Sequence, residues 1–228
     1  MANSERTFGD ILARAYRLYE AILQMLGFAP ADADIMPPAF LTFLDSVDAK
    51  NNTVAATKQE WSMALKNRIE LYFGIEGIKK RASYVIAYCR SRSDLKKEAE
   101  LIYRICKKIQ NYKKPKPEQD EKKRILGEQS YGDFVKLLGD LIEAVKQVPA
   151  YTPPNTLIKV VNLETFRTSL LAINKTIGEK YYEYSIKTKE RLAMYVTLKD
   201  KMNRIKASVK SQYGLNSNEY NSIKGIRV

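Results

Sequence analysis

"TFGDIL" at residues 7–12 and "SYGDFV" at residues 130–135 are the same short phrase, written twice in one chain. In each, a hydroxyl residue is followed by an aromatic residue, Gly, Asp and two apolar residues. An offset of 123 aligns residues 7–72 with residues 130–195 without a gap, and 19 of the 66 aligned positions are identical. Unrelated chains of ordinary composition share roughly one position in sixteen. The alignment therefore predicts an internal duplication, whose unit is far longer than the repeat of a solenoid.

The repeated phrase has the composition of a helix start. Thr7 and Ser130 are residue types that cap helices. Asp10 and Asp133 lie three positions later, where a carboxylate favours the positive end of the helix dipole. A functional site built on the two aspartates is the alternative, and we prefer the capping interpretation. Apolar residues at spacings of three and four then extend each helix over about 20 residues.

A long second helix is predicted in each copy. Residues 39–73 contain neither Gly nor Pro, and the matching stretch of the second copy contains a single glycine, Gly178. Apolar residues recur in both stretches at alternating steps of three and four, as in a heptad seam. The apolar seam residues are Phe40, Leu44, Val47, Val54, Trp61, Leu65, Tyr72 and Ile75 in the first copy, and Leu170, Ile177, Tyr181, Tyr184, Tyr195, Leu198, Met202, Ile205 and Val209 in the second. Gly74 and Gly77 are candidate breaks in the first helix, and Gly178 is one in the second.

Polar residues interrupt the seam at matching positions of the two copies. Asn51 and Asn174 form one such pair, and Arg68 and Arg191 form the other. If the seam is buried, the asparagines need hydrogen-bond partners, which would be each other or the threonines two positions on. The arginines need carboxylates or a bound anion, because an unpaired buried charge is very costly. We interpret both pairs as structural layers that set the register, and a binding cleft lined by the two arginines is the alternative.

These elements predict an all-α fold: two tandem helical repeats, each a short helix plus a long helix, packed as an up-and-down helical bundle with pseudo-two-fold symmetry. The first repeat is expected over residues 1–111 and the second over residues 127–228. Residues 112–126 between them carry prolines and many charges and are expected to form an exposed linker. A third helix, over about residues 94–110 with Ser93 as its cap, is expected in the first repeat alone.

The tail "SQYGLNSNEYNSIKGIR" (residues 211–227) contains two further signals. Gly214 is expected to terminate the long helix, and Ser217 is expected to cap a last short turn. The tail resembles the C-terminal signature of a group of uncharacterised bacterial all-helical proteins, in which a long helix ends in Tyr-Gly before Ser-x-Glu-Tyr and Gly-x-Arg. The resemblance implies a bacterial, cytoplasmic, all-helical protein, and it implies no activity.

The composition argues against several classes of site. The chain has no histidine, which excludes histidine-based triads and histidine-bound metals. Cys89 and Cys106 lie in apolar helical stretches and are expected to pack as small hydrophobic residues. Because no Gly-rich phosphate loop is present either, we expect no catalytic residue, no cofactor, no metal and no enzyme activity. No stretch reaches the ~20 apolar residues of a membrane span, and the first residues do not read as a secretory signal, so a cytoplasmic location is expected.

The net charge of +13 is concentrated in two segments. Residues 66–125 carry +10 and residues 175–228 carry +7. Such a basic helix face can bind the phosphates of a nucleic acid or an anionic membrane, and the plainer interpretation is a solvated lysine-rich face. The candidate contacts for an anion or polyanion are Arg68, Arg191, Lys79, Lys80, Arg81, Lys199, Lys201, Arg204, Lys206 and Lys210.

We therefore expect a non-enzymatic interaction or scaffold protein, whose partner is another protein or a second copy of the chain. The first alternative is a nucleic-acid-binding protein of low sequence specificity, because no base-reading motif accompanies the basic faces. The second alternative is a binder of an anionic ligand in a cleft between the repeats. Peripheral contact with a membrane is not expected.

Overall fold

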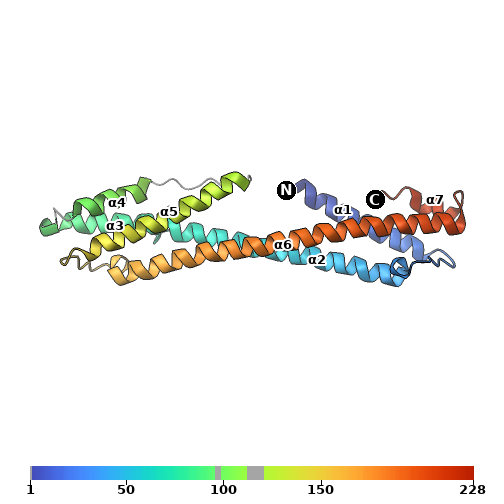
Figure 1. Cartoon of the computed structure of the whole chain (residues 1–228), viewed down its shortest axis with the longest axis horizontal. Coiled ribbons are helices and arrows are strands. Elements are labelled where there is room, and N and C mark those ends of the chain that lie inside the picture. Colours follow the sequence, from blue (N-terminus) through green and yellow to red (C-terminus); the bar gives the residue numbers. More distant parts are fainter. Residues whose placement is uncertain (1, 96–98, 112–120) are drawn as a thin grey trace. The chain divides into compact units, whose positions relative to one another are not determined.

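The structure, a computed structural model, describes residues 2–95, 99–111 and 121–228, with backbone alone for residues 2–6 and 121–130. Every regular element in these ranges is a helix, and none is a strand (Figure 1), so the predicted all-α class is confirmed. The α-helices are α1 (Ala2–Leu23), α2 (Pro37–Phe73), α3 (Ile78–Ser91), α4 (Ala99–Asn111), α5 (Glu121–Lys146), α6 (Val160–Tyr213) and α7 (Asn218–Lys224). Short 3₁₀ helices are η1 (Ala33–Ile35), η2 (Ser93–Leu95) and η3 (Thr156–Ile158).

The chain divides into two compact units. Unit 1 consists of Met1–Gln59 and Tyr182–Val228, and unit 2 consists of Glu60–Tyr181. The long helices α2 and α6 each contribute one part to unit 1 and the other part to unit 2. Each unit therefore combines a short helix and the first part of one long helix with the second part of the other long helix.

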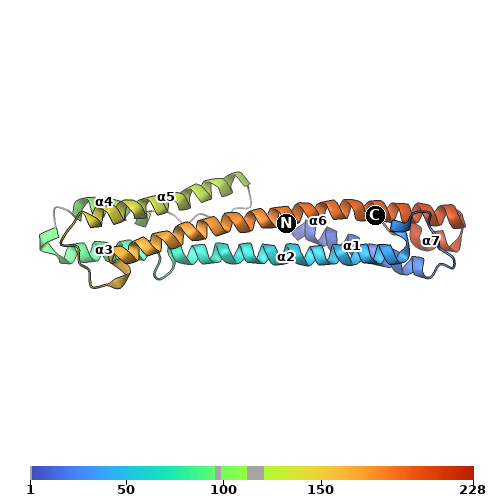
Figure 2. The ribbon, with the colours of Figure 1, turned by 60° about the horizontal axis from the view of Figure 1, so that its bottom comes forward.

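Unit 1 has its own apolar core. Figure 2 shows α1 and α7 alongside the parts of α2 and α6 that belong to this unit. The core side chains come from all four helices and include Leu18, Ile22, Phe40, Leu44, Val47, Leu198, Met202, Ile205, Val209 and Ile223. These residues follow spacings of three and four on their helices, so one stripe of each helix is buried.

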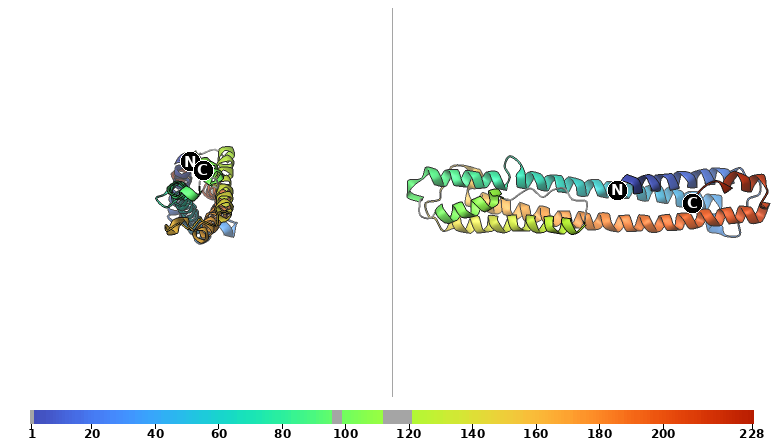
Figure 3. Two further views of the ribbon diagram at one scale, coloured as in Figure 1. Left: turned by 90° about the vertical axis from the view of Figure 1, so that its left-hand side faces the viewer. Right: turned by 90° about the horizontal axis from the view of Figure 1, so that it is seen from above.

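Unit 2 has a second core, in which α3 and α4 pack against each other and α4 packs against α5 (Figure 3). The end of α2 and the start of α6 complete it. Its buried side chains include Tyr72, Ile78, Val85, Ile102, Ile109, Phe134, Leu138, Leu141 and Leu170. Cys89 and Cys106 lie in this core as free thiols, as their apolar surroundings predicted.

Most apolar positions of the predicted seams are buried, but Trp61, Leu65, Tyr181 and Tyr184 are only half-buried, and Ile75 is exposed. The glycines near the seams also differ from one another. α2 ends at Phe73, so the predicted break near Gly74 is confirmed. A Cβ at Gly74 would lie 2.4 Å from the carbonyl oxygen of Glu70, so this turn requires glycine. In contrast, α6 runs through Gly178 without interruption over 54 residues. One exposed glycine costs a helix about 1 kcal/mol, which packing along such a long helix offsets.

The two predicted helix starts are wrong. α1 begins at Ala2 and α5 at Glu121, so Thr7 and Ser130 lie inside their helices. Residues 2–6 and 121–129 contain no proline, and therefore each helix can extend past the predicted cap toward the N-terminus. The first turns of α5 also include residues 121–126 of the expected linker, whereas residues 112–120 lie outside the described ranges.

The signals at the tail are confirmed. α6 ends at Tyr213, and Gly214 follows with a positive φ of 95°, a conformation that favours glycine. The hydroxyl of Ser217 then accepts a hydrogen bond from the Tyr220 amide at 3.0 Å and caps α7.

The helix expected over residues 94–110 is found as α4, but Ser93 begins the 3₁₀ turn η2 instead of capping α4.

Candidate functional site

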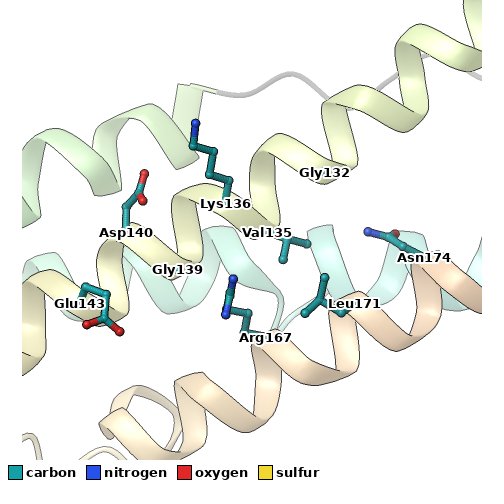
Figure 4. A pocket seen from close by; sticks show the side chains of 9 residues that line it. All are labelled: Gly132, Val135, Lys136, Gly139, Asp140, Glu143, Arg167, Leu171 and Asn174. Carbon is teal, nitrogen blue, oxygen red and sulfur yellow. The ribbon is translucent and has the colours of Figure 1, made fainter.

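A groove runs between α5 and α6 in unit 2 (Figure 4). We call it the α5–α6 groove, and its volume is about 540 Å³. Its lining residues are Gly132, Val135, Lys136, Gly139, Asp140 and Glu143 from α5, and Arg167, Leu171 and Asn174 from α6. A space of this size can hold one or two side chains of a partner or a small ligand.

Two glycines create the space. Gly132 and Gly139 are seven residues apart, so they lie two turns apart on the same face of α5. Figure 4 shows the side chain of Arg167 opposite Gly139. A Cβ at Gly139 would lie 3.1 Å from Arg167 Nε, which is tighter than an ordinary contact. The guanidinium of Arg167 therefore lies close against α5 because position 139 carries no side chain.

Most charged side chains of the groove form no hydrogen bond or ion pair with the other side chains that the structure describes. Arg167, Lys136 and Asp140 form no side-chain hydrogen bond or ion pair with any residue whose side chain is described. Glu143, by contrast, pairs with Lys146 at 3.1 Å. Both signs of charge are present, and therefore the groove does not select a simple anion or cation by charge alone.

The groove also contains apolar surface and an unsatisfied acceptor. Leu171 is 49% exposed there, and Val135 is buried beside it. The Asn174 Nδ2 donates to the Tyr72 hydroxyl at 2.9 Å, but its buried Oδ1 has no hydrogen-bond partner among the described residues. Apolar contact next to a few free polar atoms is the usual make-up of a recognition site.

The arginines of the seams are buried and each covers an aromatic ring. The Arg68 guanidinium lies 3.8 Å from the centroid of the Tyr131 ring in unit 2. The Arg191 guanidinium lies 4.6 Å from that of Phe8 in unit 1. Both buried arginines therefore make cation–π contacts with aromatic rings. A cleft that binds an anion through these arginines stays a prediction.

The asparagines of the seams do not bind each other or the neighbouring threonines, so that expectation is wrong. Asn51 Nδ2 donates to the Tyr195 hydroxyl at 2.9 Å, and Asn174 donates to the Tyr72 hydroxyl in the same way. In each case the tyrosine belongs to the other long helix. A heptad position shows that a side chain faces a partner helix, but it does not show which residue of that helix lies at the same level.

Two of the basic candidates in the first segment have structural roles. Arg81 donates to the carbonyl oxygens of Glu76 and Leu157 and covers the Phe166 ring at 4.0 Å. Burial lowers the pKa of the Arg81 guanidinium. Lys79 donates to the Gln110 carbonyl oxygen at 2.9 Å, and burial lowers its pKa as well. Lys80 is exposed.

Two candidates on α6, Lys201 and Arg204, bind the segment around η1 in unit 1. Lys201 Nζ donates to the backbone oxygen of Asp34 at 2.8 Å and to its carboxylate at 2.6 Å. Arg204 binds the carboxylates of Asp32 and Asp34, the latter at 2.7 Å. The Arg204 guanidinium, followed by Lys201, lowers the pKa of Asp34 to about 2.

Of the other α6 candidates, one binds backbone oxygens of the tail and two are exposed to solvent. Lys206 Nζ donates to the backbone oxygens of Lys224 and Ile226, at 3.2 and 2.8 Å, and so holds the tail that follows α6. Lys199 and Lys210 are exposed. Of the basic candidates, these two and Lys80 are therefore the ones most open to an external ligand.

The α5–α6 groove was not predicted from the sequence. Its one available signal was the alignment, in which Gly139 stands opposite Tyr16 and is the largest loss of side-chain volume along the two short helices.

Among the described residues, no cluster of three or more Cys, Asp or Glu side chains has the geometry to hold a metal ion. Within that same part of the chain, none of the helices is both long and apolar enough to cross a bilayer.

The chain matches no known family model, no curated protein and no solved structure. The candidate site is therefore defined by its own geometry. The resemblance of the C-terminal tail to bacterial helical proteins stays a prediction.

Proposed function

We propose that the chain is a non-enzymatic interaction protein that binds another protein through the α5–α6 groove. The observation that carries this proposal is the state of the lining residues. Arg167, Lys136 and Asp140 have no internal partner among the described side chains, next to the exposed Leu171 and the unsatisfied Oδ1 of Asn174. Apolar contact with polar groups that can still form bonds is typical of a protein-binding surface.

The second candidate is binding of nucleic acid through the basic helix faces. The internal bonds of Arg81, Lys201, Arg204 and Lys206 argue against it, because a side chain already held by backbone oxygens or carboxylates gives less to a phosphate. Lys80, by contrast, is exposed and supports a weak, salt-sensitive contact.

We also propose that the two parts of the chain are tandem repeats related by a pseudo-two-fold. The bounds of their elements support this at the offset of 123. α1 and α5 end at residues 23 and 146, η1 and η3 span residues 33–35 and 156–158, and α2 and α6 begin at residues 37 and 160.

Reciprocal contacts support the same proposal. Asn51 binds Tyr195, and its aligned counterpart Asn174 binds Tyr72, the counterpart of Tyr195. Residue i of one copy thus contacts residue j of the other, and j contacts i, which is the pattern of a symmetric homodimer interface. We infer that the chain is a fused form of such a dimer. The two units share the same arrangement of a short helix and two long helices, and the groove is present in unit 2.

A pair of glycine variants tests the proposed function. Gly139→Glu puts a side chain and a charge into the groove opposite Arg167. Gly178→Glu makes the same chemical change at a glycine of α6 where a Cβ would have open space, with no neighbouring atom within 4 Å. We expect affinity capture on the purified chain to retain a protein partner with the wild type and Gly178→Glu, and to lose it with Gly139→Glu.

Retention by both variants, or by neither the wild type nor the control, would contradict the proposal. Helix content and melting temperature measured on both variants separate a lost contact from a lost fold. The bacterial source and the cytoplasmic location stay predictions and are not needed for this test.

A further inference from the structure

We infer that the α5–α6 groove receives a tyrosine side chain of the partner protein, with its ring against the Arg167 guanidinium and its hydroxyl at the carboxylates of Asp140 and Glu143. The inference rests on the proposed function, because it names the chemistry of the partner for the same groove. Three independent features of the described residues lead to it.

The first feature is the counterpart of the groove in unit 1. The position aligned with Gly139 is Tyr16, whose half-buried ring packs against the core of that unit. Its hydroxyl donates to Asp45 Oδ1 at 3.2 Å. The chain thus places its own tyrosine at this position of unit 1, whereas unit 2 has a glycine and an open groove.

The second feature is how the chain uses its arginines. The buried arginines of the described residues are Arg68, Arg81 and Arg191, and each lies 3.8 to 4.6 Å from the centroid of an aromatic ring. Arg167 is held against α5 but contacts no aromatic ring among the side chains that the structure describes. A ring supplied by the partner would complete the cation–π contact that the other three arginines make internally.

The third feature is the charge at the end of the groove. Figure 4 shows Asp140 and Glu143 on α5 beyond Gly139, on the side away from Asn174. A carboxylate accepts a hydrogen bond from a phenol, as Asp45 does from Tyr16 in unit 1. These carboxylates therefore favour tyrosine over phenylalanine at this end of the groove.

A titration with N-acetyl-L-tyrosinamide tests the inference on the full chain. The ¹⁵N-labelled protein should show saturable shifts of the Gly132 and Gly139 backbone amides and of the Asn174 side-chain amide. N-acetyl-L-phenylalaninamide should bind more weakly, because it lacks the hydroxyl, and N-acetyl-L-leucinamide should give no saturable shift. Equal shifts with all three probes, or none with the tyrosine probe, would overturn the inference.

Two substitutions locate the probe. Gly139→Tyr should fill the groove from within and abolish the shifts, whereas the matched control Gly178→Tyr should retain them. Arg167→Met should weaken binding of the tyrosine probe about two- to fivefold, the range of an exposed cation–π contact. Binding that persists in Gly139→Tyr would place the probe elsewhere and overturn the inference, as would unchanged affinity in Arg167→Met.

The two proposals fail separately. Partner capture that depends on Gly139, without binding of the tyrosine probe, leaves the interaction function standing and removes the tyrosine as occupant. Binding of the probe in the groove without Gly139-dependent capture would instead support a tyrosine site there and contradict the proposed protein-binding function. Should Gly139→Tyr fail to fold, Gly139→Glu offers the same test, since its side chain also enters the groove and should abolish the shifts.

Discussion

The side-chain amide of Asn51 on α2 donates a 2.9 Å hydrogen bond to the hydroxyl of Tyr195 on α6. The Tyr195 side chain is buried, and this burial raises the pKa of its phenol. The bond joins residues 144 positions apart in the sequence. It therefore fixes which level of α2 faces which level of α6 in unit 1, a role that a polar residue in an apolar seam commonly has.

Removing one partner of this bond should cost more than removing both. We expect Asn51→Leu to lower the free energy of unfolding by about 1 kcal/mol, because it leaves the buried Tyr195 hydroxyl without its donor. Tyr195→Phe in the same chain should recover most of that loss. Urea unfolding of the two single variants and the double variant measures the coupling, and additive losses would show that the bond contributes nothing.

The matching bond in unit 2 should respond more weakly. The Tyr72 hydroxyl accepts from Asn174 and also donates to the Tyr131 carbonyl oxygen at 3.2 Å. Asn174→Leu therefore leaves that hydroxyl with a remaining partner, and we expect a smaller loss than for Asn51→Leu. A larger loss in the same urea experiment would contradict the assignment of these hydrogen bonds.

Acid should weaken unit 1 through Asp34. Its pKa is lowered from the usual 3.8 to about 2, chiefly by the Arg204 guanidinium, so its ionised form stabilises the folded state. That contribution is present above about pH 4 and is lost as the pH falls through about 2. We expect Asp34→Asn to flatten the pH dependence of unfolding in this window. Asp10→Asn, at an exposed aspartate of unit 1, is the matched control.

The two native thiols should be unreactive in the folded chain. Burial raises the pKa of Cys106 to about 12 and also raises that of Cys89, and only the thiolate reacts rapidly with a disulfide reagent. With Ellman's reagent at pH 8, both should react slowly in buffer and fully in concentrated guanidinium chloride. Ser62→Cys, at an exposed position of α2, should add one rapidly reacting thiol. Fast reaction of the unsubstituted chain would show that unit 2 opens readily.

Binding to DNA should be weak and sensitive to salt. Lys199 and Lys210 are exposed, so Lys199→Glu combined with Lys210→Glu tests the basic face of α6 without disturbing the contacts of Lys201 and Arg204. We expect gel shifts near 50 mM salt that disappear near 200 mM, and a further loss in the double variant. Retention of DNA near 200 mM salt would favour nucleic acid as the partner.

Local signals in the sequence predicted the helices well. The end of α6 at Gly214 and the cap at Ser217 depend on backbone groups within a few residues, and the buried stripes depend on a periodicity that one helix displays by itself. The starts of α1 and α5 were misplaced because Thr7 and Ser130 can cap a helix only if the residues before them are not helical, and here those residues are helical.

Contacts between distant segments were harder to predict. Arg204 is 170 residues from Asp34, and composition alone made it a candidate for an external polyanion. The groove depends on the absence of a side chain at Gly139 and on the approach of Arg167 from another helix. The Arg204–Asp34 pair and the groove have no local signature in the sequence, because both depend on which segments pack against each other in the fold.

The nesting of the two units in the sequence determines the order in which they can form during synthesis. Unit 2 is one continuous segment, Glu60–Tyr181, so it can close as soon as Tyr181 has left the ribosome. Unit 1 brackets it, and α1 with the first part of α2 must wait for residues 182–228. During that delay the apolar stripe of Phe40, Leu44 and Val47 lacks its α6 partner, and the nascent chain is open to chaperones or to the same stripe of a neighbouring chain.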